Sequence, residues 1–224
     1  MKTIIITGGG SGLGKELALL LAQEDFHIVL AGRHGDKLKA VLEQIEEAGG
    51  SASSLLLDVR NPDDIKEKMM VLNKAYDLYG LVNNAGIGIF GPFTESTDKE
   101  LEDSFKTNVY GPLTMTKALL PYLEKKEEGL ILNIISTAGL RGKKNEAVYC
   151  AGKFALRGFT ESMQKEYAGT GIRFVAAYMG GMNTPFWEGS NHVDPTSFRS
   201  PREVAEMIVN ELDKEEIIIE SKKS

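Results

Sequence analysis

The sequence predicts an α/β fold built as a doubly wound parallel sheet of about seven strands, with helices on both faces. Short apolar runs alternate with amphipathic stretches along the whole chain, as in repeated strand-helix units. The first apolar run, residues 3–7, leads directly into a glycine-rich turn of the kind that binds phosphate at a helix start. No repeat or linker divides the 224 residues, so we expect a single domain over 1–224.

The elements follow from the hydrophobic pattern, taken in chain order. Short apolar runs predict strands at residues 3–7, 27–32, 53–58, 80–86, 130–136, 172–178 and 216–220. Apolar residues at helical spacing predict helices at residues 13–24, 36–50, 62–76, 98–128, 149–168 and 200–212. Right-handed crossovers between parallel strands then gather ligands outside the carboxyl ends of the strands.

Composition and charge exclude several classes of function. A net charge of -6 argues against nucleic acid as the main partner. The start MKTIII lacks the features of a signal peptide, and no apolar run has the length of a membrane span, so we expect a cytoplasmic protein without membrane partners. Cys150 is the one cysteine and forms no internal disulfide. The histidines His27, His34 and His192 have no ligand spacing, so we expect no metal.

The stretch TGGGSGLGKE, residues 7–16, fits two phosphate-binding patterns. Gly9, Gly14 and Lys15 have the spacing of a P-loop, but Glu16 stands where a P-loop needs a hydroxyl for magnesium. A carboxylate there also places negative charge near the phosphates, which disfavours a triphosphate. The second pattern is a spread variant of the dinucleotide-binding glycine motif, whose backbone amides bind a pyrophosphate. On that interpretation the cofactor contacts are Gly8, Ser11, Gly12, Leu13 and Gly14.

Two residues at later strand ends refine the choice of nucleotide. Arg33 follows the second strand, where an acidic residue would bind ribose hydroxyls and an arginine pairs with a 2′-phosphate, so we expect NADP(H) rather than NAD(H). The alternative is a solvated arginine at a helix start. Asp58 ends the third strand and suits an acceptor for the adenine amino group, the acidic strand end of a P-loop site, or an N-cap for the next helix.

Further motifs carry a resemblance to a known family. The sequence reads NNAG at 83–86, TNVYG around Asn108, ISTAG around Ser136, YCAGK at 149–153 and GGMNTP at 180–185. In this order, with the glycine loop and the DV at 58–59, they make almost the whole chain resemble the short-chain dehydrogenase/reductase family. The resemblance implies a Rossmann-like oxidoreductase whose further cofactor contacts are Val59, Asn84, Ala85, Gly86, Tyr149, Lys153, Met182 and Thr184.

The chemistry of the YCAGK segment agrees with this resemblance. Tyr149 and Lys153 are four residues apart, on one helix face, and a nearby ammonium lowers the pKa of a phenol. Tyr149 would give its proton to a carbonyl oxygen while Ser136 donates a second hydrogen bond to it. The resemblance implies that Lys153 also holds the ribose and that Asn108 keeps a water for proton relay. Alternatively, Asn108 is a structural polar residue that kinks its helix.

The segment after the sixth strand departs from the family pattern. Met179 stands where proline is usual, which predicts a more flexible turn. The substrate loop, about 184–200, is short. We expect an apolar wall for an aromatic or alicyclic ketone, formed by Phe186, Trp187, Phe90, Phe93 and Leu140. Alternatively, these side chains are ordinary core or interface residues.

Two functions remain after these observations. The first is an NADP-dependent carbonyl reductase, reversible as an alcohol dehydrogenase, acting on a small hydrophobic ketone, diketone or aldehyde. The second is a redox-silent nucleotide-binding sensor or scaffold protein of the same fold, which needs the glycine loop but not the catalytic set. Apolar residues on the helices at 98–128 and 149–168 permit a homodimer or homotetramer.

Overall fold

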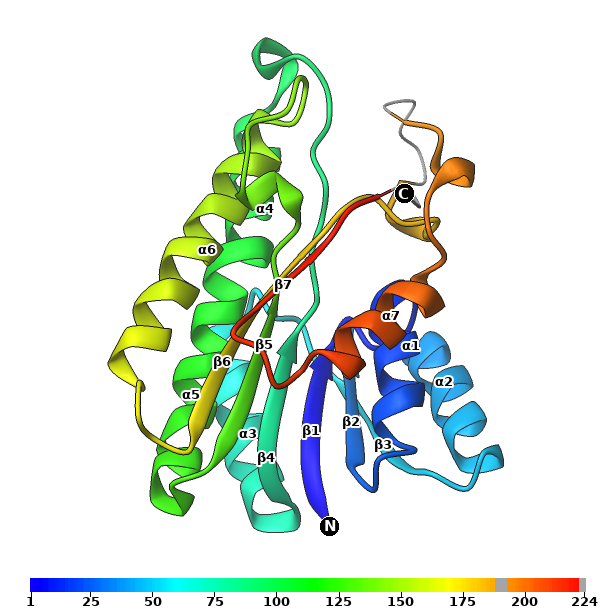
Figure 1. Ribbon diagram of the computed structural model, residues 1–224, viewed down its shortest axis with the longest axis vertical. Coiled ribbons are helices and arrows are strands. Elements are labelled where there is room, and N and C mark those ends of the chain that lie inside the picture. The colour runs from blue at the N-terminus through cyan, green and yellow to red at the C-terminus, as the bar shows by residue number, and fades with distance from the viewer. Residues whose placement is uncertain (188–192, 222–224) are drawn as a thin grey trace.

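The computed structural model describes residues 1–187 and 193–221. Within these residues, seven parallel strands form one sheet in the order β3-β2-β1-β4-β5-β6-β7 (Figure 1). The order in which strands are added to the sheet reverses between β1 and β4, which confirms the predicted doubly wound fold. The strands are β1 Lys2–Thr7, β2 His27–Gly32, β3 Ser51–Leu56, β4 Asp77–Asn83, β5 Gly129–Ile134, β6 Ile172–Met179 and β7 Glu216–Ile219.

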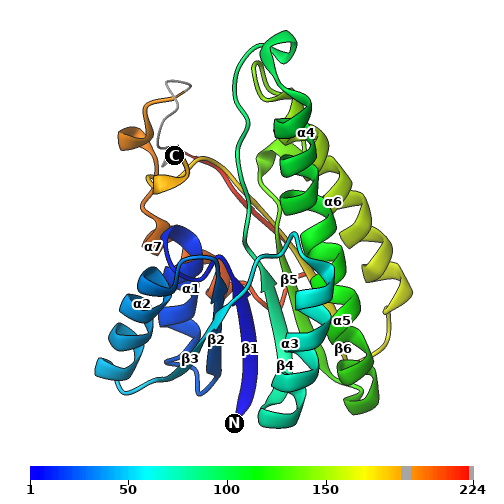
Figure 2. The same ribbon diagram turned by 180° about the vertical axis from the view of Figure 1, so that it is seen from behind.

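Helices cover both faces of the sheet, as Figures 1 and 2 show from opposite sides. Their buried apolar residues divide into one core between the sheet and α1, α2 and α7, and a second between the sheet and α3 and α5. Burial of such apolar stripes from water is the main stabilising contribution in a fold of this kind. The helices are α1 Gly12–Leu21, α2 Gly35–Glu47, α3 Pro62–Ala75, α4 Asp98–Phe105, α5 Gly111–Lys126, α6 Ala147–Glu166 and α7 Pro201–Asn210.

The helical segment predicted over 98–128 is interrupted in its middle. A capping box between Thr97 and Glu100 begins α4, and a π-helical turn, Lys106–Tyr110, separates α4 from α5. A π turn shifts the hydrogen-bond register by one residue and is frequent at functional sites. Shorter 3-10 turns lie at Phe93–Glu95, Thr137–Gly139, Pro185–Trp187 and Pro195–Ser197.

A buried polar chain joins the central strands to α6. Asn83 on β4 donates to the Asn133 side chain on β5 over 2.8 Å, and Asn133 donates to the Thr160 hydroxyl on α6 over 2.9 Å. All three side chains are buried. Because buried polar groups need partners, these bonds fix how α6 lies against the sheet. Within the described chain, no helix is long and apolar enough to cross a membrane.

Candidate active site

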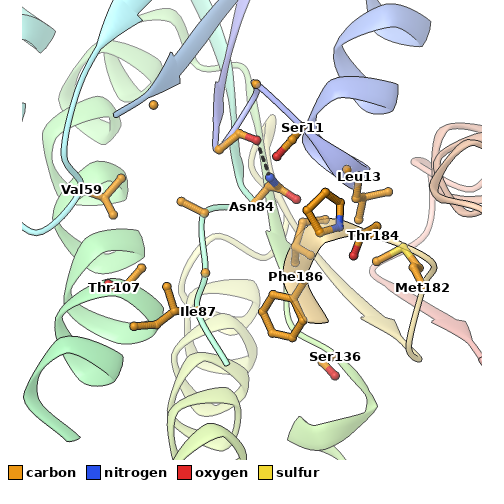
Figure 3. A pocket seen from close by; sticks show the side chains of 18 of the residues that line it. Ser11, Leu13, Val59, Asn84, Ile87, Thr107, Ser136, Met182, Thr184 and Phe186 are labelled. Carbon is orange, nitrogen blue, oxygen red and sulfur yellow. Dashed lines mark hydrogen bonds between the residues drawn. The ribbon is translucent and has the colours of Figure 1, made fainter. Parts of the chain in front are cut away.

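A cavity of about 390 Å³ opens at the carboxyl ends of the strands. Figure 1 shows the segments that follow β4 and β6 extending beyond these ends, and Figure 3 shows the cavity from close by. The structure brings most of the predicted site residues together there, and they come from seven separate segments of the chain. The predicted residues that line it are Gly8, Ser11, Gly12, Leu13, Arg33, Asp58, Val59, Asn84, Ala85, Gly86, Ser136, Tyr149, Lys153, Met182 and Thr184.

The glycine loop is held open toward the cavity by contacts with the end of β4. The Asn84 side chain donates to the Thr7 carbonyl over 2.9 Å and to the Gly8 carbonyl over 3.2 Å. Gly12 has a φ of +53°, in the left-handed region that favours glycine. Gly14 does not line the cavity; a Cβ there would lie 2.4 Å from the Gly8 carbonyl oxygen, so its role is close packing beneath the loop.

The first turn of α1 provides a site for an anion. Ser11 occupies the N-cap position but makes no side-chain cap bond, and the first turn contains no acidic residue. Backbone N–H groups at such a helix start lack intrahelical partners and carry partial positive charge. The residues present therefore fit a bound pyrophosphate. Lys15 is absent from the cavity lining, which agrees with a helix residue rather than a triphosphate ligand.

Basic residues gather where β2 meets α2. Arg33 lines the cavity, as predicted, together with His34 and Lys37 from the start of α2. Sequence analysis did not single out His34 or Lys37 for this role. Because all three follow the strand end within one helical turn, their position is suited to a phosphate on an adenosine ribose.

Asp58 lies beside a second arginine that sequence analysis missed. The Arg60 guanidinium donates to both carboxylate oxygens of Asp58, the shortest bond being 2.7 Å, and also contacts Asp103 on α4 at 3.2 Å. These hydrogen bonds from Arg60 lower the pKa of Asp58. The N-cap of the next helix is Asn61, which accepts from the Asp64 N–H, so the interpretation of Asp58 as that cap is wrong.

Ser136, Tyr149 and Lys153 converge at one end of the cavity. Ser136 follows β5 with a φ of +112°, a backbone conformation that a non-glycine residue adopts only at a cost. Lys153 is 4% exposed, and its Nζ donates to the Ile134 carbonyl over 2.8 Å and lies 5.6 Å from the centre of the Tyr149 ring. The two helical residues therefore share a face, as their spacing predicted.

Burial is the largest influence on the pKa values of Tyr149 and Lys153. It raises the pKa of Tyr149 well above its usual value, while a hydrogen bond with Ser136 opposes the increase. Burial also lowers the pKa of Lys153 from 10.5 to about 8. Besides burial and Ser136, the groups that shift the pKa of Tyr149 are Glu146 and Cys150, and the expected lowering of that pKa by Lys153 stays a prediction.

Asn108 lies within the π-helical turn and does not line the cavity. Its side-chain amide accepts from the Ile87 N–H over 2.9 Å and donates to the Ile87 carbonyl over 2.8 Å. These bonds tie the interrupted helix to the segment that follows NNAG. They agree with the structural interpretation of Asn108, and its role in holding a water stays a prediction.

Three of the five predicted wall residues form an aromatic cluster over Tyr149. Phe90, Phe186 and Trp187 pack against one another with ring centres 4.9 to 5.8 Å apart, and Phe90 and Phe186 also contact the Tyr149 ring. The prediction is wrong for Phe93, which is 61% exposed, and for Leu140, which packs in a separate cluster with residues of α6 and β6. Residues 188–192 of the substrate loop lie outside the described residues.

Met179 and the turn after β6 close the cavity on its remaining side. Met179 is the last residue of β6 and its side chain is buried in the core shared with α1 and α7. Trp187 donates from its ring nitrogen to the Met182 carbonyl over 3.0 Å. A Cβ at Gly12 would lie 3.4 Å from the Thr184 side chain, so the turn approaches the glycine loop closely. Figure 3 shows Ser11, Leu13 and Thr184 on this side of the cavity.

No cluster of three or more metal-ligating side chains occurs in the part of the chain that the structure describes. His192, one of the histidines considered above, lies outside that part.

Comparison with known proteins gives a consistent result. A family model described as short chain dehydrogenase matches residues 2–194. A ketoacyl reductase, HetN, from Nostoc sp. (strain PCC 7120) is 35% identical over 175 residues, which are 76% of this chain and 60% of the relative. The match therefore spans less than two thirds of that relative's length.

Solved structures share the fold closely. A variant of actinorhodin polyketide ketoreductase with NADPH has a TM-score of 0.89 and 28% identity, over 97% of this chain and 95% of the other. A short chain dehydrogenase/reductase from Burkholderia phymatum, in complex with NAD, has the same TM-score, over 98% of this chain and 88% of the other. At 22% identity, the second structure shows the fold alone.

Proposed function

Since the chain belongs to the short chain dehydrogenase family, we propose that it transfers hydride between NADP(H) and a small hydrophobic carbonyl or alcohol substrate. The substrate would be a ketone, diketone or aldehyde in the direction of reduction. The observation that carries this proposal is the convergence of Ser136, Tyr149 and Lys153 in one corner of a cavity that also receives the glycine loop. A nucleotide-binding protein without redox chemistry would need only the loop.

The residues that would hold the cofactor follow from the cavity. The open first turn of α1 would bind the pyrophosphate, and Arg33, His34 and Lys37 would bind a 2′-phosphate. When bound, NADPH supplies a hydride to the carbonyl carbon. We favour NADP(H) over NAD(H) because three basic side chains gather where a ribose-binding acid would be needed for NAD.

The side chains of the cavity would manage the charge on the carbonyl oxygen. Tyr149 keeps its proton in this environment, because burial raises the pKa of the phenol, and so it is suited to donate that proton in reduction. Ser136 would donate a second hydrogen bond where negative charge develops. Lys153, held by the Ile134 carbonyl, would then help to restore the proton of Tyr149.

Cofactor preference gives a direct test. Substitution Arg33→Asp removes a cation that would pair with the 2′-phosphate and places an acid where it accepts from ribose hydroxyls, so we expect the ratio of NADPH to NADH affinity to fall by at least about tenfold. Arg173→Asp is a matched control, because Arg173 is exposed near the amino end of β6, away from the carboxyl ends of the strands where the cavity lies. Fluorescence titration of both cofactors measures the ratio. An unchanged ratio in the Arg33 variant would refute the assignment of Arg33.

Turnover separates the two functions that remain. NADPH consumption with a panel of ketones, diketones and aldehydes supports the reductase. Tight NADPH binding with no turnover of any carbonyl would favour the redox-silent sensor. The homodimer or homotetramer and the cytoplasmic location stay predictions; sedimentation at micromolar concentration tests the first, and a sharp monomer would contradict it.

A further inference from the structure

A buried carboxylate lies in the cavity next to the proposed acid. Glu146 is 5% exposed, lines the cavity and forms the N-cap residue of α6. It precedes Tyr149 by three residues, and residues at this spacing lie on the same helix face, one turn apart. Glutamate is rarely this buried, and Glu146 is not among the residues assigned above to the cofactor or to proton transfer.

The charge of Glu146 reaches the reacting group. After burial, the Glu146 carboxylate is the largest contribution that raises the pKa of Tyr149. Two cations lie nearby: Lys153 on the same helix, whose Nζ is 5.6 Å from the centre of the Tyr149 ring, and Lys143 in the loop before it, whose Nζ lies 4.0 Å from the Glu146 carboxylate. The Lys143 side chain is 28% exposed, so water screens its charge more than that of Glu146, whose side chain is 7% exposed.

The loop that carries Phe90 is bound to the backbone just before Glu146. The Gly91 N–H donates to the Asn145 carbonyl over 2.8 Å, which joins the loop of Phe90 to the residue just before Glu146. A substrate bound at Tyr149 would therefore lie in a cavity that Phe186 and Glu146 both line, with the Phe90 and Phe186 rings against the Tyr149 ring. Because Glu146 and Tyr149 are both buried, a charge on the substrate would be weakly screened from the carboxylate.

We propose that Glu146 sets the charge selectivity of the substrate site, so that it accepts neutral and cationic aromatic ketones and rejects ketones that bear a carboxylate. The inference rests on the proposed function and names the substrate class of that site. A carboxylate on the substrate would meet the negative charge of Glu146 in a desolvated space. An ammonium group would meet the same charge with attraction and lie near aromatic faces that also favour a cation.

Three ketones of similar shape test the proposal: para-acetylbenzoate, para-acetylbenzamide and para-(aminomethyl)acetophenone. Their kcat/KM values with NADPH are measured for the wild type and for Glu146→Gln, which keeps the shape and removes the charge. We expect the wild type to prefer the amide over the benzoate by at least about tenfold, and Glu146→Gln to bring that ratio close to one. Lys143→Gln should increase the preference, because it removes the nearby cation.

Glu166→Gln is the matched control, since Glu166 is exposed at the far end of the same helix. It should leave the ratio unchanged, because twenty helical residues separate it from the site by about 30 Å, beyond the range of screened charges. A wild type without preference for the amide would overturn the proposal. So would a preference that persists in Glu146→Gln.

The failure of the proposed function would give a different result. In that case none of the three ketones is reduced, and isothermal titration measures their affinities for the wild type and Glu146→Gln instead. Weaker binding of the benzoate that recovers in the variant would still support the charge selectivity. Equal affinities, or no binding of any of the three, would overturn it.

Discussion

Substitution Lys153→Met is expected to stabilise the protein at pH 7 while it removes turnover. Burial lowers the pKa of Lys153 from 10.5 in the unfolded chain to about 8 in the folded chain. At about 1.4 kcal/mol per pKa unit, carrying the buried ammonium costs about 3 kcal/mol of folding stability below pH 8. Methionine has a similar volume without the charge, so the variant escapes that cost.

One loss opposes this gain. The Ile134 carbonyl accepts from the Lys153 Nζ over 2.8 Å, and a buried carbonyl without its donor costs about 1 kcal/mol. The net expectation at pH 7 is a gain of about 2 kcal/mol, or a melting temperature higher by about 4 to 8 °C for a chain of this size. Lys117→Met, at an exposed position on α5, is the control for the same change of side chain.

The pH dependence distinguishes this explanation from better packing. Between about pH 8 and 10.5 the unfolded wild type binds more protons at Lys153 than the folded wild type, so its stability rises with pH relative to the variant. Urea unfolding at a series of pH values should therefore show a gap that shrinks across this window. A variant less stable than the wild type at pH 7, or a gap independent of pH, would refute the reasoning.

Backbone strain at Ser136 and the buried polar chain through Asn133 should both affect stability. Ser136→Gly should raise the free energy of unfolding by about 1 to 2 kcal/mol, because glycine tolerates the φ of +112°, and should lower turnover; Ser136→Ala should lower turnover without the gain. Equal stability of the two variants in urea would show that the backbone of Ser136 is not strained. Asn133→Leu removes the bonds to Asn83 and Thr160 and should cost about 2 kcal/mol or more in the same assay, whereas an unchanged midpoint would show that this buried chain contributes little.

The sequence was sufficient to predict the helices and strands, and most of the predicted site residues line the cavity. Hydrophobic period distinguishes strands from helices, and the polar residues at strand ends meet because the carboxyl ends of parallel strands share one edge of the sheet. The π-helical turn at Lys106–Tyr110 was not predicted, because a shift of one residue in hydrogen-bond register leaves the apolar pattern almost unchanged.

Other features depend on contacts that spacing does not reveal. Arg60 pairs with Asp103, which lies on α4 after the intervening β4, and only the assembled fold brings them together. Phe90 and Phe93 lie in one loop, yet only Phe90 packs inward, which composition alone does not distinguish. Glu146 was missed because a glutamate in a polar loop is typically solvated.

In the function proposed above, Tyr149 protonates a carbonyl in an NADPH-dependent reduction. The most direct test of this step is NADPH oxidation by the wild type and by Tyr149→Phe, with any ketone that the wild type reduces and with NADPH binding measured in parallel. We expect the variant to bind NADPH as the wild type does and to lose turnover by at least about a hundredfold, because the ring remains and the proton donor is gone. Retained turnover in Tyr149→Phe would contradict it.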